Sequence, residues 1–265
     1  MIEITLPVIV AALASGAVIG LFLGLFGGGG SVLAVPLLLY AVGVTDPHLA
    51  IGTSAAAVAA IALVNLRGHS REGRVKWPCA MMFAGAGIVG SLIGSWLALR
   101  VPGDWLLFAF AFAMAAIGLS MLRPAAGQGN PDIHITRQMM TRLVPLGLLT
   151  GLAAGFFGIG GGFLIVPGLM LATGMTLSHA AASSLVSVAV FGSATALNYG
   201  LHGEVDLRLT SLLLLGGAIG GLIGIRLARI LAPRVRLARI GFAVLIVTVA
   251  AYVGWKAAAA LGWTG

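Results

Sequence analysis

Acidic residues are scarce in this chain, and none lies deep inside an apolar segment. All seven fall in or beside polar stretches: Glu3, Asp46, Glu72, Asp104, Asp132, Glu204 and Asp206. A proton relay through buried carboxylates, which marks many membrane pumps, is therefore not visible. Cysteine is nearly absent too, because Cys79 has no partner in the chain for a disulfide or a metal site. We expect no metal and no cofactor.

Charge of either sign is rare, and apolar residues dominate. Only 8% of the 265 residues are charged, whereas 60% are hydrophobic, and the mean hydropathy is +1.10. Such a composition predicts an all-α integral membrane protein. Ten apolar segments follow one another, at about residues 5–26, 31–44, 48–66, 78–99, 104–122, 143–158, 162–175, 179–200, 207–231 and 236–258. The second and seventh are short for a full membrane span, so 8 to 10 transmembrane helices are expected.

An internal duplication organises these segments. The stretch 20–36, GLFLGLFGGGGSVLAVP, returns 131 residues later as 151–167, GLAAGFFGIGGGFLIVP, with ten of seventeen positions identical. A repeated interruption of an apolar segment by glycine is typical of secondary transporters whose site lies between two repeats. The sequence predicts repeats at 1–124 and 142–265, each of about five segments, joined by a cytoplasmic linker at 125–141.

The distribution of basic residues predicts that the two repeats are inverted. Arginine and lysine gather at 67–76, in the central linker and at 226–239, whereas the loops at 100–104 and 201–208 are nearly neutral. Basic loops tend to stay in the cytoplasm. Five segments per repeat then give the repeats opposite orientations and place both termini outside the cytoplasm. The net charge of +8 follows from this topology, and we expect no nucleic-acid partner.

The glycine motifs predict a site for an anion. A helix that stops at a run of glycines and restarts exposes backbone N–H groups and the positive end of a helix dipole. The restarted segments can be half-helices, tilted short helices or re-entrant legs. A flexible hinge or a tight helix crossing is the alternative interpretation. Other glycines, at 87, 90 and 94 and at 216, 220 and 224, indicate close helix packing.

Polar residues near the breaks complete the candidate site. Thr53 and Ser184 align across the duplication, and the amides Asn65 and Asn198 form a second matched pair. Each of these side chains can either take part in helix packing or contact the substrate. The candidate substrate-binding residues are Gly27, Gly28, Gly29, Gly30, Ser31, Thr53, Ser54, Asn65, Gly158, Gly160, Gly161, Gly162, Ser183, Ser184 and Asn198.

Two matched histidines could couple transport to protons. His48 and His179 each stand at a predicted helix start, and Asp46 with Pro47 resembles an N-cap and first turn. Histidine ionises near neutral pH and can assist an anion or a proton-coupled step. A solvated interface residue is the alternative role.

The paired motifs resemble a known family. The G-x-G-G-G pattern with a following proline (Pro36, Pro167), the Gly52-Thr53-Ser54 and Ser183-Ser184 positions and the two-repeat layout look like the TauE/SafE sulfite-exporter permeases. The resemblance implies a multi-pass protein of the bacterial inner membrane that transports sulfite, sulfoacetate or other sulfonates. The alternatives are an anion channel and a permease for a non-sulfur organic anion. No catalytic pattern of residues favours an enzyme.

Overall fold

The fold is all-α. A computed structural model describes residues 5–122, 136–158, 162–231 and 235–262. Within these ranges there is no β-strand, and eight helices are long and apolar enough to cross a membrane. Large apolar side chains such as Phe112 and Leu222 are exposed on the outside, where lipid would cover them, and Trp77 and Trp105 are exposed at helix starts, as at membrane interfaces. The predicted all-α membrane class is confirmed.

The elements fall into two matching series. The first comprises α1 (Leu6–Phe26), the 3-10 helix η1 (Gly27–Leu33), α2 (Ala34–Leu37), the π-helical turn η2 (Leu38–Val42), α3 (Pro47–Arg71), α4 (Trp77–Ala98) and α5 (Gly103–Leu122). The second comprises α6 (Arg137–Phe157), α7 (Gly162–Thr173), α8 (Leu177–Leu201), α9 (Leu207–Leu231) and α10 (Val235–Ala260). Helix α6 begins inside the stretch expected to be linker.

Local sequence explains where the central helices start. The Asp46 carboxylate accepts a hydrogen bond from the His48 N–H at 2.8 Å, and Pro47 occupies the first turn of α3. The predicted N-cap is therefore present. In α8 the Thr176 hydroxyl caps the equivalent turn by accepting from the His179 N–H at 3.4 Å.

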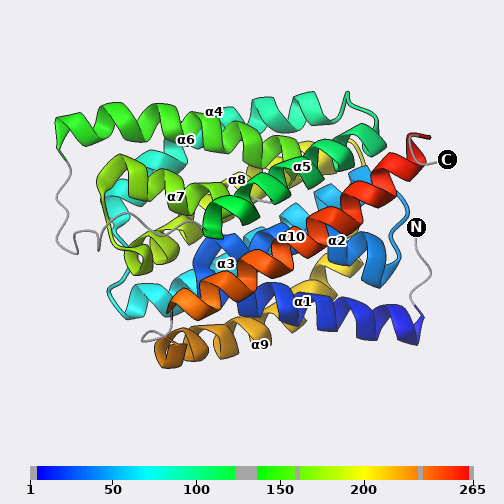
Figure 1. The fold of residues 1–265 in the computed structure, drawn as a ribbon, viewed down its shortest axis with the longest axis horizontal. Coiled ribbons are helices and arrows are strands. Elements are labelled where there is room, and N and C mark those ends of the chain that lie inside the picture. The colour runs from blue at the N-terminus through cyan, green and yellow to red at the C-terminus, as the bar shows by residue number, and fades with distance from the viewer. Residues whose placement is uncertain (1–4, 123–135, 159–161, 232–234, 263–265) are drawn as a thin grey trace.

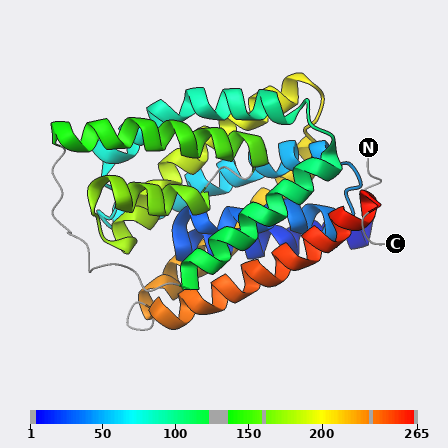
Figure 2. The same cartoon turned by 45° about the horizontal axis from the view of Figure 1, so that its top comes forward.

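The two glycine motifs make re-entrant hairpins. Helix α1 and the leg η1–α2–η2 form one apolar helical run, Leu6–Val42, but Gly27, with φ 65° and ψ −141°, turns the chain inside it. Helix α6 ends at Gly158, also with positive φ, and α7 has only 12 residues. At about 1.5 Å per residue, α7 is too short to cross. Each hairpin starts and returns at the same end of the molecule (Figures 1 and 2).

The first restart differs from the expected helix at 31–44. The chain continues directly from α1 as the 3-10 helix η1, becomes α-helical only over Ala34–Leu37 and ends as a π-helical turn at Val42. Four consecutive glycines lower the preference for α-helix here, and the tighter 3-10 winding takes its place. The second restart, α7, is α-helical from Gly162, as expected.

The repeats interlock instead of lying side by side. Helix α1 packs chiefly on α9, and its counterpart α6 packs on α4; α5 pairs with α10, and α3 with α8. Each of these pairs joins one repeat to the other. Helices α3 and α8 are central, buried over 72% and 67% of their apolar stretches, whereas the other spans are buried over 33–44%.

Glycine allows the interlocked helices to touch backbone to backbone. A Cβ on Gly20 of α1 would collide with Gly217 of α9, and one on Gly151 of α6 would collide with Gly87 of α4. These two contacts are equivalent when the repeats are exchanged. The predicted packing role of the 87–94 and 216–224 glycines is confirmed, and it operates between the repeats.

Connections of like charge lie together. The α3–α4 connection, the end of α9 and the start of α10, which carry basic residues, lie at one end of the bundle in both views (Figures 1 and 2). The α4–α5 and α8–α9 connections, which are nearly neutral, lie at the opposite end with the start of α1 and the end of α10. The helices of the second repeat therefore run opposite to their counterparts, which confirms the inverted arrangement.

Close packing on α4 can be tested with two glycines of that helix. A Cβ at Gly90 would collide with the backbone of α6 at Leu148 and Leu152, whereas one at Gly85 meets nothing within 4 Å. We expect Gly90→Ala to destabilise the protein by about 1–3 kcal/mol. Gly85→Ala should be neutral or slightly stabilising, because alanine favours helix. Thermal unfolding in detergent measures both, and equal effects would contradict interlocking through α4 and α6.

Candidate functional site

The two glycine breaks meet at the interface between the repeats. A Cβ on Gly28 would collide with the backbone of Gly162, and one on Gly162 would collide with Gly28. Both glycines are buried. The sequence predicted each break, and the fold brings them into direct contact. Gly160 and Gly161 lie outside the described residues.

A positive φ is the shared geometric requirement of the breaks. Gly27 has φ 65° and Gly158 has φ 67°, and these glycines occupy equivalent positions in the duplicated motif. The left-handed region is costly for any residue with a Cβ. Space is short as well, because a Cβ would strike Ala181 at the first position and Ile51 at the second. Only glycine satisfies both constraints.

Serine hydroxyls from the central helices hold the breaks. The Gly28 N–H donates to the Ser184 Oγ at 2.9 Å, and the Ser184 hydroxyl donates to the Ala181 carbonyl at 2.7 Å. The Ser31 hydroxyl donates to the Gly28 carbonyl at 2.8 Å. Ser54 donates to the Ile51 carbonyl at 2.9 Å and lies 3.4 Å from the Gly158 carbonyl. Ser31, Ser54 and Ser184 are therefore at the breaks, as predicted.

The hydroxyls of Thr53 and Ser183 accept hydrogen bonds from loops of the opposite repeat. The Asp206 N–H donates to Thr53 Oγ1 at 3.0 Å, and the Lys76 N–H donates to Ser183 Oγ at 2.9 Å. Each hydroxyl thus anchors the loop that precedes a helix of the opposite repeat. In the structure Thr53 is equivalent to Ser183, and Ser54 to Ser184, a spacing of 130 residues. The sequence alignment had paired Thr53 with Ser184 and was one residue out of register.

The matched asparagines bridge helices away from the contact between the breaks. The Asn65 amide donates to the Gly20 carbonyl of α1 at 3.4 Å, and its Oδ1 lies beside Gly221 of α9. The Asn198 amide donates to Ser95 Oγ of α4 at 2.8 Å. Asn65 therefore links the central helix α3 to α1 and α9, and Asn198 links the central helix α8 to α4. These contacts favour a role in helix packing over a role in substrate binding.

The two remaining glycines of the first break differ in the space around them. A Cβ on Gly30 would collide with Phe22 and Leu23, whereas one on Gly29 would meet only Phe242 at 3.5 Å and Phe26 at 3.6 Å. Gly29 is buried, but a Cβ there would make only ordinary van der Waals contacts, so a collision does not explain its glycine identity.

Aromatic rings flank each break, and sequence reasoning missed them. Phe26, which ends α1, stacks on Phe242 of α10 with ring centroids 4.6 Å apart. Phe157, its counterpart at the end of α6, lies 5.9 Å from Phe110 of α5. Phe26 and Phe157 are identical positions of the duplicated motif, a signal that was available. Their partners come from distant helices and needed the tertiary structure.

The histidines lie at opposite ends of the bundle. His48 starts α3 at the neutral end, with its ring 6.1 Å from that of Tyr199. His179 starts α8 at the basic end, and its Nδ1 lies 2.7 Å from the Thr176 hydroxyl. Each stands in the first turn of its helix, so a coupling role would act from the ends of the bundle.

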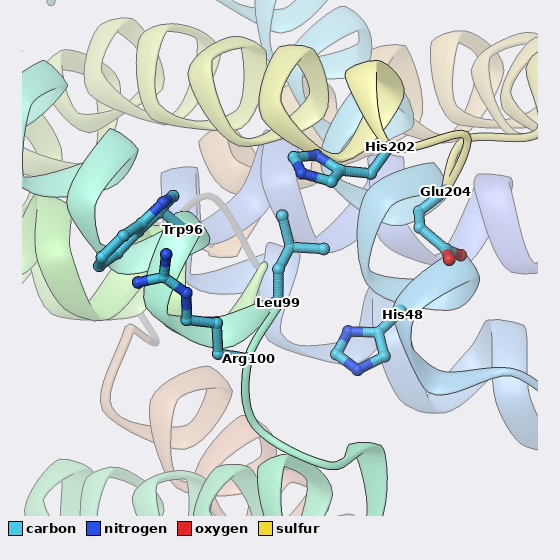
Figure 3. A pocket seen from close by; sticks show the side chains of 6 residues that line it. All are labelled: His48, Trp96, Leu99, Arg100, His202 and Glu204. Atoms are coloured by element: carbon cyan, nitrogen blue, oxygen red, sulfur yellow. The ribbon is translucent and has the colours of Figure 1, made fainter.

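A cavity of about 350 Å³ opens at the neutral end. Its walls come from the start of α3, the end of α4 with the two residues beyond it, and the α8–α9 connection: His48, Trp96, Leu99, Arg100, His202 and Glu204 (Figure 3). None of the predicted substrate-binding residues lines it. Within the described ranges, no group of three or more His, Cys, Asp or Glu is placed to hold a metal ion.

The chain is similar to known membrane proteins. The family model described as "Sulfite exporter TauE/SafE" matches residues 12–253. A "Probable membrane transporter protein" from Xylella fastidiosa is 44% identical over 97% of this chain and 99% of its own length. The "Probable membrane transporter protein YdhB" from Bacillus subtilis is 30% identical, covering 82% and 89%. No solved structure matches.

The hydrogen bond between the repeats at Gly28 can be tested against a matched serine. Ser184→Ala removes the acceptor for a buried N–H, so we expect a loss of about 1–3 kcal/mol in unfolding free energy. Ser187 is equally buried on the same helix and has no hydrogen-bond partner among the described residues. Ser187→Ala should therefore change thermal unfolding little. An equal response of the two variants would contradict the assignment of Ser184.

Proposed function

Because the chain belongs to the sulfite exporter TauE/SafE family, we propose that it transports small sulfur-containing anions, such as sulfite, sulfoacetate or other sulfonates, by alternating access. It is a membrane transporter, as its relatives are named. The observation that carries the proposal is the contact between Gly28 and Gly162, where the two breaks meet between inverted repeats. Substrate sites of inverted-repeat transporters occupy this position.

The electrostatics of the breaks favour an anion. Helix α7 starts at Gly162, so its unpaired N–H groups and the positive end of its dipole face the contact between the breaks. Hydroxyls of Ser54 and Ser184 stand beside them. The five acids in the described ranges lie in loops or helix-end turns, so no carboxylate opposes an anion there.

The packing explains how access could alternate. In this conformation the breaks touch, and the Gly28 N–H is satisfied by Ser184. A substrate oxyanion could replace that serine as acceptor when the repeats separate. Since every main helix pair joins one repeat to the other, a rocking movement of one repeat would change both ends of the bundle together. A continuously open channel would need the breaks to stay apart.

Uptake into proteoliposomes tests the substrate class directly. We expect saturable uptake of at least one anion from a panel of labelled sulfite, thiosulfate, sulfoacetate and taurine. Saturation with slow turnover indicates a carrier, whereas single-channel currents would indicate the anion channel. Uptake of a non-sulfur organic anion with none of the panel would contradict the proposed substrates.

Gly29 is the glycine of the first break at which an added Cβ meets no collision. A Cβ there would be in ordinary van der Waals contact with Phe242 at 3.5 Å and Phe26 at 3.6 Å, and the larger side chain of Gly29→Leu would fill the break, so the amount of folded protein in the membrane is measured beside transport. We expect transport to fall below detection. Gly85→Leu, on the lipid-facing side of α4, is the matched control and should transport normally. Retained transport in Gly29→Leu would refute the glycine site.

We further propose the bacterial inner membrane, with the basic connections in the cytoplasm and both termini outside. The support is that the basic α3–α4 connection and the basic end of α9 lie at one end of the bundle, opposite the neutral connections. A tag at either terminus should be reached by an impermeant reagent in intact spheroplasts. A tag that reacts only after lysis would reverse the orientation.

A further inference from the structure

The two ends of the bundle are built from equivalent connections, but the side chains at each end interact differently. The hydrogen bonds of Thr53 and Ser183 relate the α8–α9 connection to the α3–α4 connection at a spacing of 130 residues. At the basic end Glu72 forms ion pairs with Arg74, at 2.8 Å, and with Arg229 of the opposite repeat. The second ion pair links the two repeats at this end.

The equivalent residues at the neutral end cannot form that cluster. At the same spacing Glu72, Arg74 and Arg229 correspond to His202, Glu204 and Leu99. All three line the cavity of about 350 Å³. Where one end has a carboxylate between two guanidinium groups, the other has an aliphatic side chain and a cavity of the size that small-molecule sites occupy.

The cavity offers an anion one permanent positive charge. The Arg100 guanidinium lies over the Trp96 ring, 3.1 Å from its centroid, and Glu204 is on the opposite wall (Figure 3). Within the described residues the ion pairs are those of Glu72, so Arg100 is not neutralised by a carboxylate. The His202 Nδ1–H donates to the Asn198 carbonyl at 2.8 Å, which leaves its Nε2 available.

One face of α3 connects the cavity with a glycine break. His48 lines the cavity, Ile51 one turn further presses on Gly158, and Ser54 after another turn reaches the Gly158 carbonyl. Residues three apart share a helix face. Two buried polar atoms near this face, His48 Nδ1 and the Tyr199 hydroxyl, have no hydrogen-bond partner among the described residues. Both atoms can therefore still form a hydrogen bond.

We propose that the cavity is an access vestibule in which the substrate anion first binds, with Arg100 as the receiving group, while the Glu72 cluster closes the opposite end. The inference rests on the proposed anion transport and adds a second, peripheral binding site. Glu204 repels the anion and confines it to the side of Arg100 and Trp96. The two charges therefore act on the anion with opposite signs.

Transport kinetics with sulfite supplied on the neutral-loop side test this assignment. Arg100→Gln should raise the KM about tenfold, equivalent to about 1.4 kcal/mol, and Arg100→Lys should recover part of it. Glu204→Gln should lower the KM about twofold. Arg208 is exposed at the same end and does not line the cavity, so Arg208→Gln controls for surface charge. Equal effects of the two arginine variants would overturn the vestibule.

A binding measurement separates failure of the vestibule from failure of the proposed function. Iodide, an anionic quencher, should quench the fluorescence contributed by Trp96, obtained by difference from Trp96→Phe. Arg100→Gln should weaken iodide quenching relative to quenching by neutral acrylamide, which reports how far the loss of the guanidinium uncovers the Trp96 ring. Unaltered iodide quenching overturns the vestibule even if wild-type protein transports. Absence of sulfur-anion transport with quenching as expected overturns only the proposed substrates.

Discussion

Backbone contact between helices of opposite repeats is the constraint on which this structure depends. In a bilayer, apolar side chains gain little by leaving lipid, so helices associate through close packing and satisfied polar groups. Gly20 on Gly217 and Gly151 on Gly87 bring main chains together where any Cβ would collide. Because these contacts join the two repeats, neither repeat can bury its helices alone.

The same constraint makes the glycine breaks tolerable. Irregular backbone at membrane depth requires partners inside the protein, and these come from the central helices α3 and α8 through Ser54 and Ser184. The interlocked helices place Gly28 against Gly162 and bury both glycines. The Gly28 N–H, bonded to Ser184 in this conformation, is the group at which we propose that an anion replaces the serine.

The inverted repeats place equivalent connections at the two ends of the bundle, and these connections carry different side chains. Duplication supplies matching connections at both ends, and divergence then changes their charges. At the basic end Glu72 is held by Arg74 and Arg229, whereas His202 at the corresponding neutral position lines a cavity. Two copies of one scaffold thereby present an ion-pair cluster at one end and a cavity at the other in a single conformation.

The sequence by itself determined the membrane class, the duplication, the inversion and the glycine breaks, because composition, spacing and loop charge are properties of the chain. Ser54 and Ser184 could be named as candidates for the same reason. Only the tertiary structure decided that Thr53 and Ser183 anchor loops, that Asn65 bridges helices, and that Phe242 and Phe110 flank the breaks. Those roles depend on which residues of opposite repeats become neighbours, and that pairing follows from three-dimensional interlocking, which has no counterpart in local periodicity.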